Sequence, residues 1–242
     1  MHAPPDPFAG VAALNGVGSS AAHARDSIDA LLRHPAMRRE AARVAAESAL
    51  MGGRASAALA GADPVDVADP HLQGALRMVA EVPELAGVWS RSPRQALARL
   101  HVLAARDLVD DEDLLGRPRA DVDAARLDQL MDLAVAPTAA PAVVVAAIVH
   151  GELRSLRPFG TADDLVARAA ERLVLVARGV DTKAVSVPEA GHLALVRAYE
   201  PLLEAYAAGS PDGVGAWVRH CTEAYARGAE EGLGIAARPG GS

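Results

Sequence analysis

The sequence predicts an all-α protein, and three features support that prediction. Hydrophobic residues make up 51% of the 242 residues but aromatic residues only 3%, so the core is built from Ala, Leu and Val, a mixture that favours close-packed helices. Apolar residues recur at three- and four-residue steps through most of the chain, as on one face of a helix. Proline and glycine separate these periodic segments.

Two helices joined by a short break are expected at the centre of the fold. The run from Val143 to Val149 carries no charge, which predicts a helix buried on most sides. The second helix ends at Gly179, and its apolar positions recur at helical spacing, namely Leu165, Ala169, Leu173 and Val176. Its charged positions fall on other faces, namely Arg168, Glu171, Arg172 and Arg178. We therefore predict that the second helix is half-buried.

The break between these helices, 158–162, is where we expect any chemistry. Thr161 followed by Asp164 resembles a capping box, in which the Thr side chain caps the helix. A well-capped helix after a Pro-containing turn is the simplest interpretation of this segment.

Further helices are expected before and after the hairpin. Residues 22–59 are predicted to be helical, with a second helix starting at Pro35 and a kink at Gly52-Gly53. The other predicted helices are 71–82, 93–108, 122–135, 188–206 and 216–231. The predicted organisation is a flexible lead-in over 1–18, N-terminal helices over 19–62, a helical core over 63–231 and a flexible tail over 232–242.

Charge and cysteine content exclude several classes of function. A net charge of -7 and a pI of about 5.6 disfavour nucleic-acid binding. The single Cys221 allows no internal disulfide and predicts no cysteine-based zinc site, so we expect no metal and a cytoplasmic location. No signal peptide and no uninterrupted stretch of 18 apolar residues is seen in the sequence, which disfavours secretion and membrane spanning.

The segment from Gly16 to Ala21 reads GVGSSA and superficially matches a dinucleotide-binding fingerprint. That motif needs a strand before it and an acidic residue at the end of the next strand. The residues that follow read as helix, so a nucleotide-dependent oxidoreductase is only a remote alternative.

The segment Arg157–Arg168, RPFGTADDLVAR, resembles the signature of the Fic (Fido) family, H-x-F-x-[DE]-G-N-G-R-x-x-R. Phe159 and Arg168 match, and His150 stands where many members carry an upstream His. The resemblance implies an all-helical fold and transfer of AMP, with ATP and magnesium, to protein hydroxyls. Arg157 stands at the position of the catalytic His, Thr161 at that of the metal-binding acid, and the G-N-G-R run is replaced by Ala162, Asp163, Asp164 and Leu165.

Each replacement removes a piece of that chemistry. The guanidinium of Arg157 stays protonated and cannot act as a general base. Asp163 and Asp164 place carboxylates where glycines would let backbone N–H groups approach phosphates. Thr161 offers no carboxylate to a magnesium ion. ATP with magnesium is therefore disfavoured as a cofactor.

Three other stretches extend the resemblance. Ser56, Ala60 and Gly61 align with the family's inhibitory motif [ST]-x-x-x-E-[GN], with Ala60 at the position of the Glu, so Arg168 is expected to lack its usual partner. Arg119, after Leu100-His101 and Gly116, matches an arginine of an upstream motif, and Trp217 resembles the tryptophan of the last helix.

Two functional hypotheses follow. The first is a Fic-like protein without adenylyl transfer that acts as a binding or regulatory module, with a protein partner or a small anion held near Arg168 and Arg119. The second is a transferase that uses Asp163 or Asp164 as a base or cation ligand and Arg157 and Arg168 as phosphate clamps. A homodimer is compatible with the Ala-rich surfaces.

Overall fold

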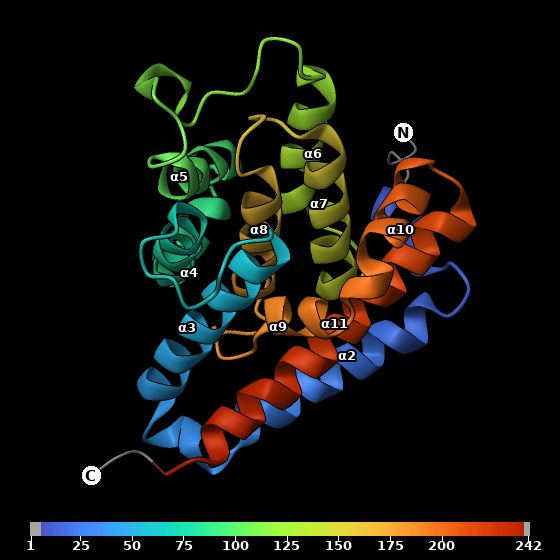
Figure 1. The fold of residues 1–242 in the computed structure, drawn as a ribbon. Helices are drawn as coiled ribbons and strands as arrows, with labels where there is room; N and C mark the ends of the chain where they lie inside the picture. Colours follow the sequence, from blue (N-terminus) through green and yellow to red (C-terminus); the bar gives the residue numbers. More distant parts are fainter. Residues whose placement is uncertain (1–5, 240–242) are drawn as a thin grey trace.

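The computed structural model describes residues 6–239, and Figure 1 shows them as a bundle of helices. The α-helices are α1 (Pro7–Ala12), α2 (Val17–Arg33), α3 (Ala41–Leu59), α4 (Pro70–Trp89), α5 (Pro93–Ala105), α6 (Ala124–Val135), α7 (Ala142–Leu156), α8 (Asp163–Ala177), α9 (Pro188–Ala194), α10 (Val196–Ala207) and α11 (Pro211–Ala237), with short 3₁₀ turns at Pro35–Arg38 and Glu112–Leu114. No strand occurs within residues 6–239. The predicted all-α class is confirmed.

The predicted central hairpin is present. α7 and α8 pack against each other and lie inside a shell formed by the other helices (Figure 1). Every residue of α7 from Val143 to Gly151 is buried, as its uncharged sequence predicts.

The prediction of a half-buried second helix is wrong, because α8 is buried from Leu165 to Leu175. Arg168, Glu171 and Arg172 are each no more than 1% exposed. Burial of an unpaired charge is prohibitive, and each of these side chains has a partner that the sequence does not display. Arg172, for example, is paired with Glu189 of α9 at 2.9 Å.

The outer helices form two groups around the hairpin. α3, α4 and α5 cover one side, where α4 packs on α8 (Figure 1). α2 and α11 run side by side in parallel on the other: Arg219 donates to the carbonyl of Asn15 at one end, and Gly232 meets Leu31 at the other. α9 packs on α11 and α3, and α10 packs on α11 and α7.

Parts of both predicted flexible ends are helical. Within the predicted lead-in, 7–12 is a helix capped by Asp6, and α2 begins at Val17. Within the predicted tail, α11 continues to Ala237 with Ile235 only 1% exposed. These segments are ordered because they bury apolar side chains. Residues 1–5 and 240–242 of those two predictions lie outside the described residues.

Several predicted helix boundaries are also corrected. α4 continues through Pro83 to the buried Trp89. α3 is one continuous helix from Ala41 to Leu59, which includes Gly52-Gly53, where the sequence predicts a kink. These glycines instead allow close packing, since a Cβ at Gly52 would meet Arg172 and Glu189. The predicted helix over 188–206 is two helices separated at Leu195.

The dinucleotide-binding alternative is wrong. The residues before Gly16 form helix α1 and a turn, and the segment from Val17 onward is α2, so the described chain has no strand to begin a βαβ unit. As to membranes, none of the helices over residues 6–239 has the length and apolar composition needed to cross one.

Candidate functional site

The loop 157–162 between α7 and α8 has an unusual backbone. Arg157, Gly160 and Ala162 all have positive φ angles, of 46°, 78° and 53°. Glycine adopts this region freely, but Arg and Ala pay a steric cost on the order of 1 kcal/mol each. The loop is therefore held in a conformation that two of its three left-handed residues do not favour.

Asp163 holds this loop in place. Its carboxylate accepts hydrogen bonds from the backbone N–H of Phe159 at 2.9 Å and of Gly160 at 2.7 Å. Burial raises the pKa of Asp163 above its usual value, while the two N–H donors act in the opposite direction. The chain's own carboxylate thus occupies backbone donors of the kind that bind anions at helix N-termini.

The capping-box prediction at Thr161 is wrong. The residue that precedes α8 is Ala162, which has no side-chain cap, and the acidic side chain that bonds the turn is Asp163 rather than Asp164. The cause is the left-handed Ala162, which shifts the helix start by one residue from the expected cap.

Arg168 is buried and has three hydrogen bonds. Its Nε donates to Oγ of Ser56 at 2.8 Å, and its Nη2 donates to the carbonyl of Ser56 at 2.9 Å and to Asp164 at 3.0 Å. Arg168 thus lacks the glutamate that the family motif would supply, since Ala60 stands at that position, and Ser56 and Asp164 are its partners instead. Burial raises the pKa of Asp164, but the charge and hydrogen bond of Arg168 outweigh burial, so the pKa lies below its ordinary value.

The α3 segment aligned with the inhibitory motif does lie beside α8. Ser56 provides both contacts to Arg168, whereas Ala60 ends α3 as its C-cap and Gly61 follows with a φ of 82°. Ser56 therefore bonds Arg168 in this chain, whereas Ala60, at the position of the motif's Glu, has no side-chain group that could do so.

The upstream stretch also reaches the loop. Arg119 donates from its backbone N–H to the carbonyl of Pro158 at 2.8 Å and from Nε to the carbonyl of Arg157 at 3.1 Å. Its guanidinium pairs with Asp121, and the side chain of Arg157 is exposed. Arg157 is therefore exposed at the loop, whereas Arg168 is buried.

His101 supports the loop from the other side. Its ring stacks on Phe159 with centroids 4.0 Å apart, and its Nδ1 accepts a hydrogen bond from Gly116 at 2.9 Å. Burial lowers the pKa of His101 to about 4, so the ring is neutral at pH 7. These contacts place the upstream stretch and the signature-like loop together, as the resemblance implies.

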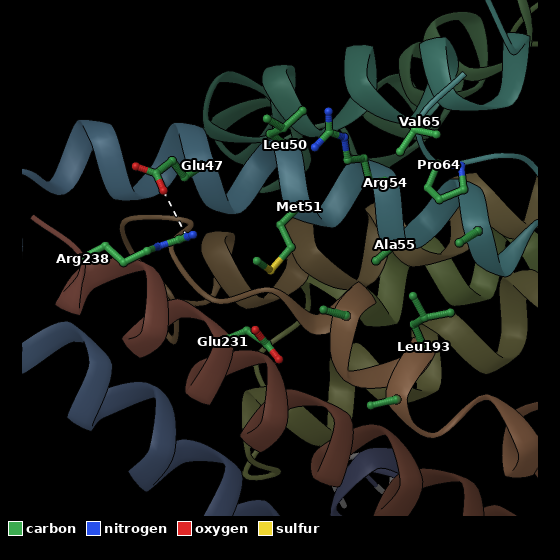
Figure 2. Close-up of a pocket in the computed structure, with 13 residues that line it drawn as sticks. Glu47, Leu50, Met51, Arg54, Ala55, Pro64, Val65, Leu193, Glu231 and Arg238 are labelled. Carbon is green, nitrogen blue, oxygen red and sulfur yellow. Dashed lines mark ion pairs between the residues drawn. The ribbon is translucent and has the colours of Figure 1, made fainter. Parts of the chain in front are cut away.

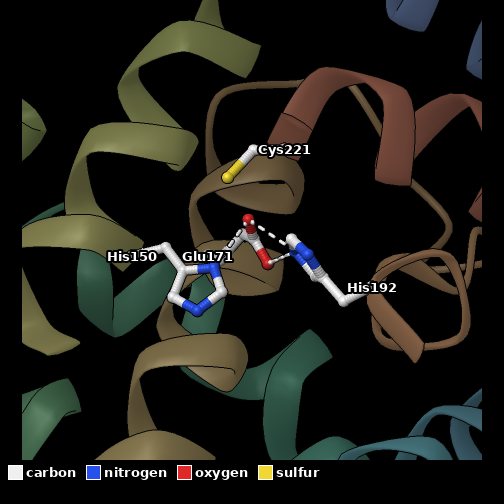
Figure 3. A group of neighbouring side chains, drawn as sticks. All are labelled: His150, Glu171, His192 and Cys221. Carbon is white, nitrogen blue, oxygen red and sulfur yellow. Dashed lines mark hydrogen bonds and ion pairs between the residues drawn. The ribbon is translucent and has the colours of Figure 1, made fainter. Parts of the chain in front are cut away.

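A second cluster of polar side chains lies deeper in the core, and no pattern in the sequence predicts it. His150 of α7, Glu171 of α8, His192 of α9 and Cys221 of α11 converge in the core, as Figure 3 shows. From the sequence, the single Cys221 predicts no cysteine-based zinc site. No spacing signal could reveal the cluster, because the four residues come from four helices spread over 72 positions.

A cavity lies elsewhere, between α3, α9 and α11, and has a volume of about 650 Å³. Its wall is mostly apolar, with Met51, Ala55 and Leu193 facing it (Figure 2). Ala58 also lines it. Charged residues lie along its edge, where Arg238 pairs with Glu47 at 3.1 Å. We call this cavity the α3/α9/α11 groove. No local sequence pattern predicts this groove, because its walls come from distant segments.

Comparison with known proteins supports the resemblance at the level of the fold. The chain is similar to the crystal structure of a Fic family protein from Desulfovibrio desulfuricans G20 at 2.70 Å resolution, with a TM-score of 0.65 and 18% identity. The match covers 91% of this chain and 76% of that one. No family model and no curated protein matches the sequence. The protein therefore has an all-α, Fic-like fold.

Proposed function

We propose that this protein uses a Fic-like fold without transferring AMP and acts as a binding or regulatory module. One observation carries the proposal: the carboxylate of Asp163 is bonded to the backbone N–H groups of Phe159 and Gly160. A phosphate approaching this turn would meet a negative charge in place of free donors.

The surrounding residues support the same conclusion. Arg157 stands where the Fic signature has its general base, and a guanidinium cannot accept a proton at neutral pH. Loss of a general base typically reduces the rate by about 10² to 10⁴. Arg168 is directed to Ser56 and Asp164 and is only 1% exposed, so it is not available to a phosphate.

Binding is supported by the α3/α9/α11 groove. A volume of about 650 Å³ falls in the range of small-molecule pockets. Its apolar wall and charged edge fit a partner with an apolar body and a polar end better than they fit a small anion. We therefore place the binding role at this groove rather than at the loop 157–162.

The absence of AMP transfer is tested with radiolabelled ATP and magnesium, incubated with the purified protein and a cell lysate. We expect no label on any protein beyond the background without the protein, and no saturable heat when ATP and magnesium are titrated by calorimetry. An active Fic adenylyltransferase in the same lysate is the positive control. Labelling that is lost in Arg157→Ala would refute the proposal and support the transferase that uses Asp163 or Asp164.

The binding role is tested by a thermal-shift screen of small amphipathic molecules. Ala58→Trp places an indole in the α3/α9/α11 groove, whereas Ala42→Trp adds one to the exposed face of the same helix. A ligand of the groove should stabilise the wild type and Ala42→Trp but not Ala58→Trp. Equal stabilisation of all three would place the binding site elsewhere.

A further inference from the structure

His150, Glu171, His192 and Cys221 each direct a metal-binding atom toward one point in the core. These four atoms all lie within 4.8 Å of one another, and all four residues have 0% exposure. Each residue comes from a different helix, so the cluster lies where α7, α8, α9 and α11 meet (Figure 3).

One atom of this cluster is not satisfied by the protein. Nδ1 of His150 is buried and has no hydrogen-bond partner. It lies 3.0 Å from Oε1 of Glu171 without the alignment of a hydrogen bond. An unpaired buried polar atom is unfavourable, and a cation at the centre of the cluster would use its lone pair.

The second ring nitrogen of each histidine and the carboxylate of Glu171 have polar partners around the cluster, as ligands in metal sites do. Nε2 of His150 lies 2.6 Å from Oη of Tyr199, and Nδ1 of His192 lies 3.3 Å from Nε2 of His220. Tyr225 donates to Oε1 of Glu171 at 2.5 Å. Histidines that bind a metal usually use the second ring nitrogen in such a contact, and metal-bound carboxylates are likewise hydrogen-bonded.

We propose that His150, Glu171, His192 and Cys221 bind one Zn²⁺ ion that joins four helices of the core. Two imidazoles, a carboxylate and a thiolate are a donor set that zinc accepts in tetrahedral geometry. Ligand atoms around a tetrahedral zinc lie about 3.3–3.8 Å apart, given the usual bond lengths. The distances in the cluster bracket this range, with both histidine nitrogens 3.0 Å from Glu171 and all four ligand atoms within 4.8 Å of one another.

The charges and protons of the proposed site balance. The thiol of Cys221 loses its proton to solvent when it binds the ion. The thiolate and the carboxylate of Glu171 then neutralise Zn²⁺, so the buried centre carries no net charge. All four positions of the tetrahedron are taken by protein, which is the pattern of structural rather than catalytic zinc. This inference is independent of the proposed binding function.

The test begins from unfolded, metal-free protein, because a fully buried site is loaded during folding. The chain is unfolded in guanidinium chloride with a chelator and refolded with or without zinc, and bound metal is measured by mass spectrometry. We expect about one zinc per chain and a melting temperature several degrees higher in the zinc-refolded sample. Refolding with Co²⁺ should give the visible bands of tetrahedral cobalt and a near-ultraviolet thiolate-to-cobalt band.

Two variants make the test specific. Cys221→Ala should lower the affinity for zinc at least tenfold and remove the thiolate-to-cobalt band. His101→Ala is the matched control, since His101 is another buried histidine, 1% exposed, that lies outside the cluster. The His101→Ala protein should retain about one zinc per chain, even if the substitution lowers its melting temperature.

Two results would overturn the inference. The first is wild-type protein that refolds to the same melting temperature with and without zinc and holds less than about 0.1 zinc per chain. The second is Cys221→Ala with unchanged zinc content and cobalt spectrum. If Cys221→Ala does not fold, the wild-type cobalt spectrum decides, because Cys221 is the single cysteine of the chain and the thiolate band has no other source.

Discussion

Asp163 and Asp164 are neighbours in the sequence but have different roles in the structure. Asp163 faces back to the loop and bonds two backbone N–H groups, whereas Asp164 faces along α8 and pairs with Arg168. The pKa shifts differ accordingly: burial raises the pKa of Asp163, and Arg168 brings that of Asp164 below its usual value against the effect of burial. Two adjacent carboxylates therefore face different partners: Asp163 holds the loop and Asp164 pairs with Arg168.

The pairing of Asp164 with Arg168 predicts a pH-dependent contribution to stability. A carboxylate whose pKa is lowered by folding stabilises the folded state above its unfolded pKa of about 3.9, and that stabilisation is lost as pH falls through the folded pKa. We expect Asp164→Asn to reduce the free energy of unfolding at pH 7 by about 1.5–3 kcal/mol. The difference from wild type should shrink below pH 4. Urea unfolding at several pH values measures both.

Asp121→Asn is the control for this prediction. Asp121 pairs with Arg119 at 3.2 Å, but its side chain is 75% exposed, and exposed ion pairs contribute about 0–1 kcal/mol. Its effect should therefore be small at every pH. An Asp164→Asn variant that matches Asp121→Asn across the pH range would contradict the role given to Arg168.

At the scale of elements, small residues set how closely the helices around the hairpin pack. Gly191 of α9 lies directly on the backbone of α11 at Ala224, and Gly151 of α7 faces the indole of Trp217. The close approach of α9 to α11 places His192 beside Glu171. Helix packing, rather than any local motif, therefore assembles the buried cluster.

We predict that Gly191→Ala separates α9 from α11. A Cβ at Gly191 would overlap the carbonyl of Ala224, and backbone atoms cannot move aside as a flexible side chain can. Overpacking of this kind costs about 1–3 kcal/mol. Chemical denaturation should show this loss of stability. Gly234→Ala in α11 is the control, because a Cβ there meets no atom within 4 Å, and an equal loss in both variants would contradict the packing argument.

At the scale of the whole molecule, helices from the N-terminal and C-terminal parts of the chain pack against each other. α2 and α11 pack side by side, and Arg43 at the start of α3 donates to the carbonyls of Ile235 and Arg238. Ile235 is 1% exposed and Gly232 lies against Leu31. The C-terminal turns of α11 are therefore part of the core.

Truncation tests this view of the C-terminus. Removing residues 232–242 deletes the buried Ile235 and Ala236, and complete burial of one large apolar side chain is worth about 1.5–3 kcal/mol. We expect that truncation to lower the free energy of unfolding by about 3 kcal/mol, whereas removing only 240–242 should change it little. Thermal and urea unfolding of the two truncated proteins provide the comparison. Equal stability of both would favour the flexible tail predicted from the sequence.

The sequence by itself determined the helical class and the central hairpin. Uncharged residues over Val143–Val149 leave no polar face, so this segment is buried in any fold that the chain adopts. The spacing of Phe159, Arg168 and Arg119 pointed to the Fic-like arrangement that the structural similarity bears out. These features are encoded by nearby residues, which is why they can be predicted.

Only the tertiary structure decided the partners of the charged residues. The charge pattern of α8 predicts a half-exposed helix, but the helix is buried. Its charged residues can be buried because Ser56 bonds Arg168 and Glu189 pairs with Arg172, and sequence periodicity does not reveal these partners. The convergence of His150, Glu171, His192 and Cys221 is likewise a product of how four helices pack. Contacts between distant segments depend on helix packing and not on local spacing, so they became visible only in the folded chain.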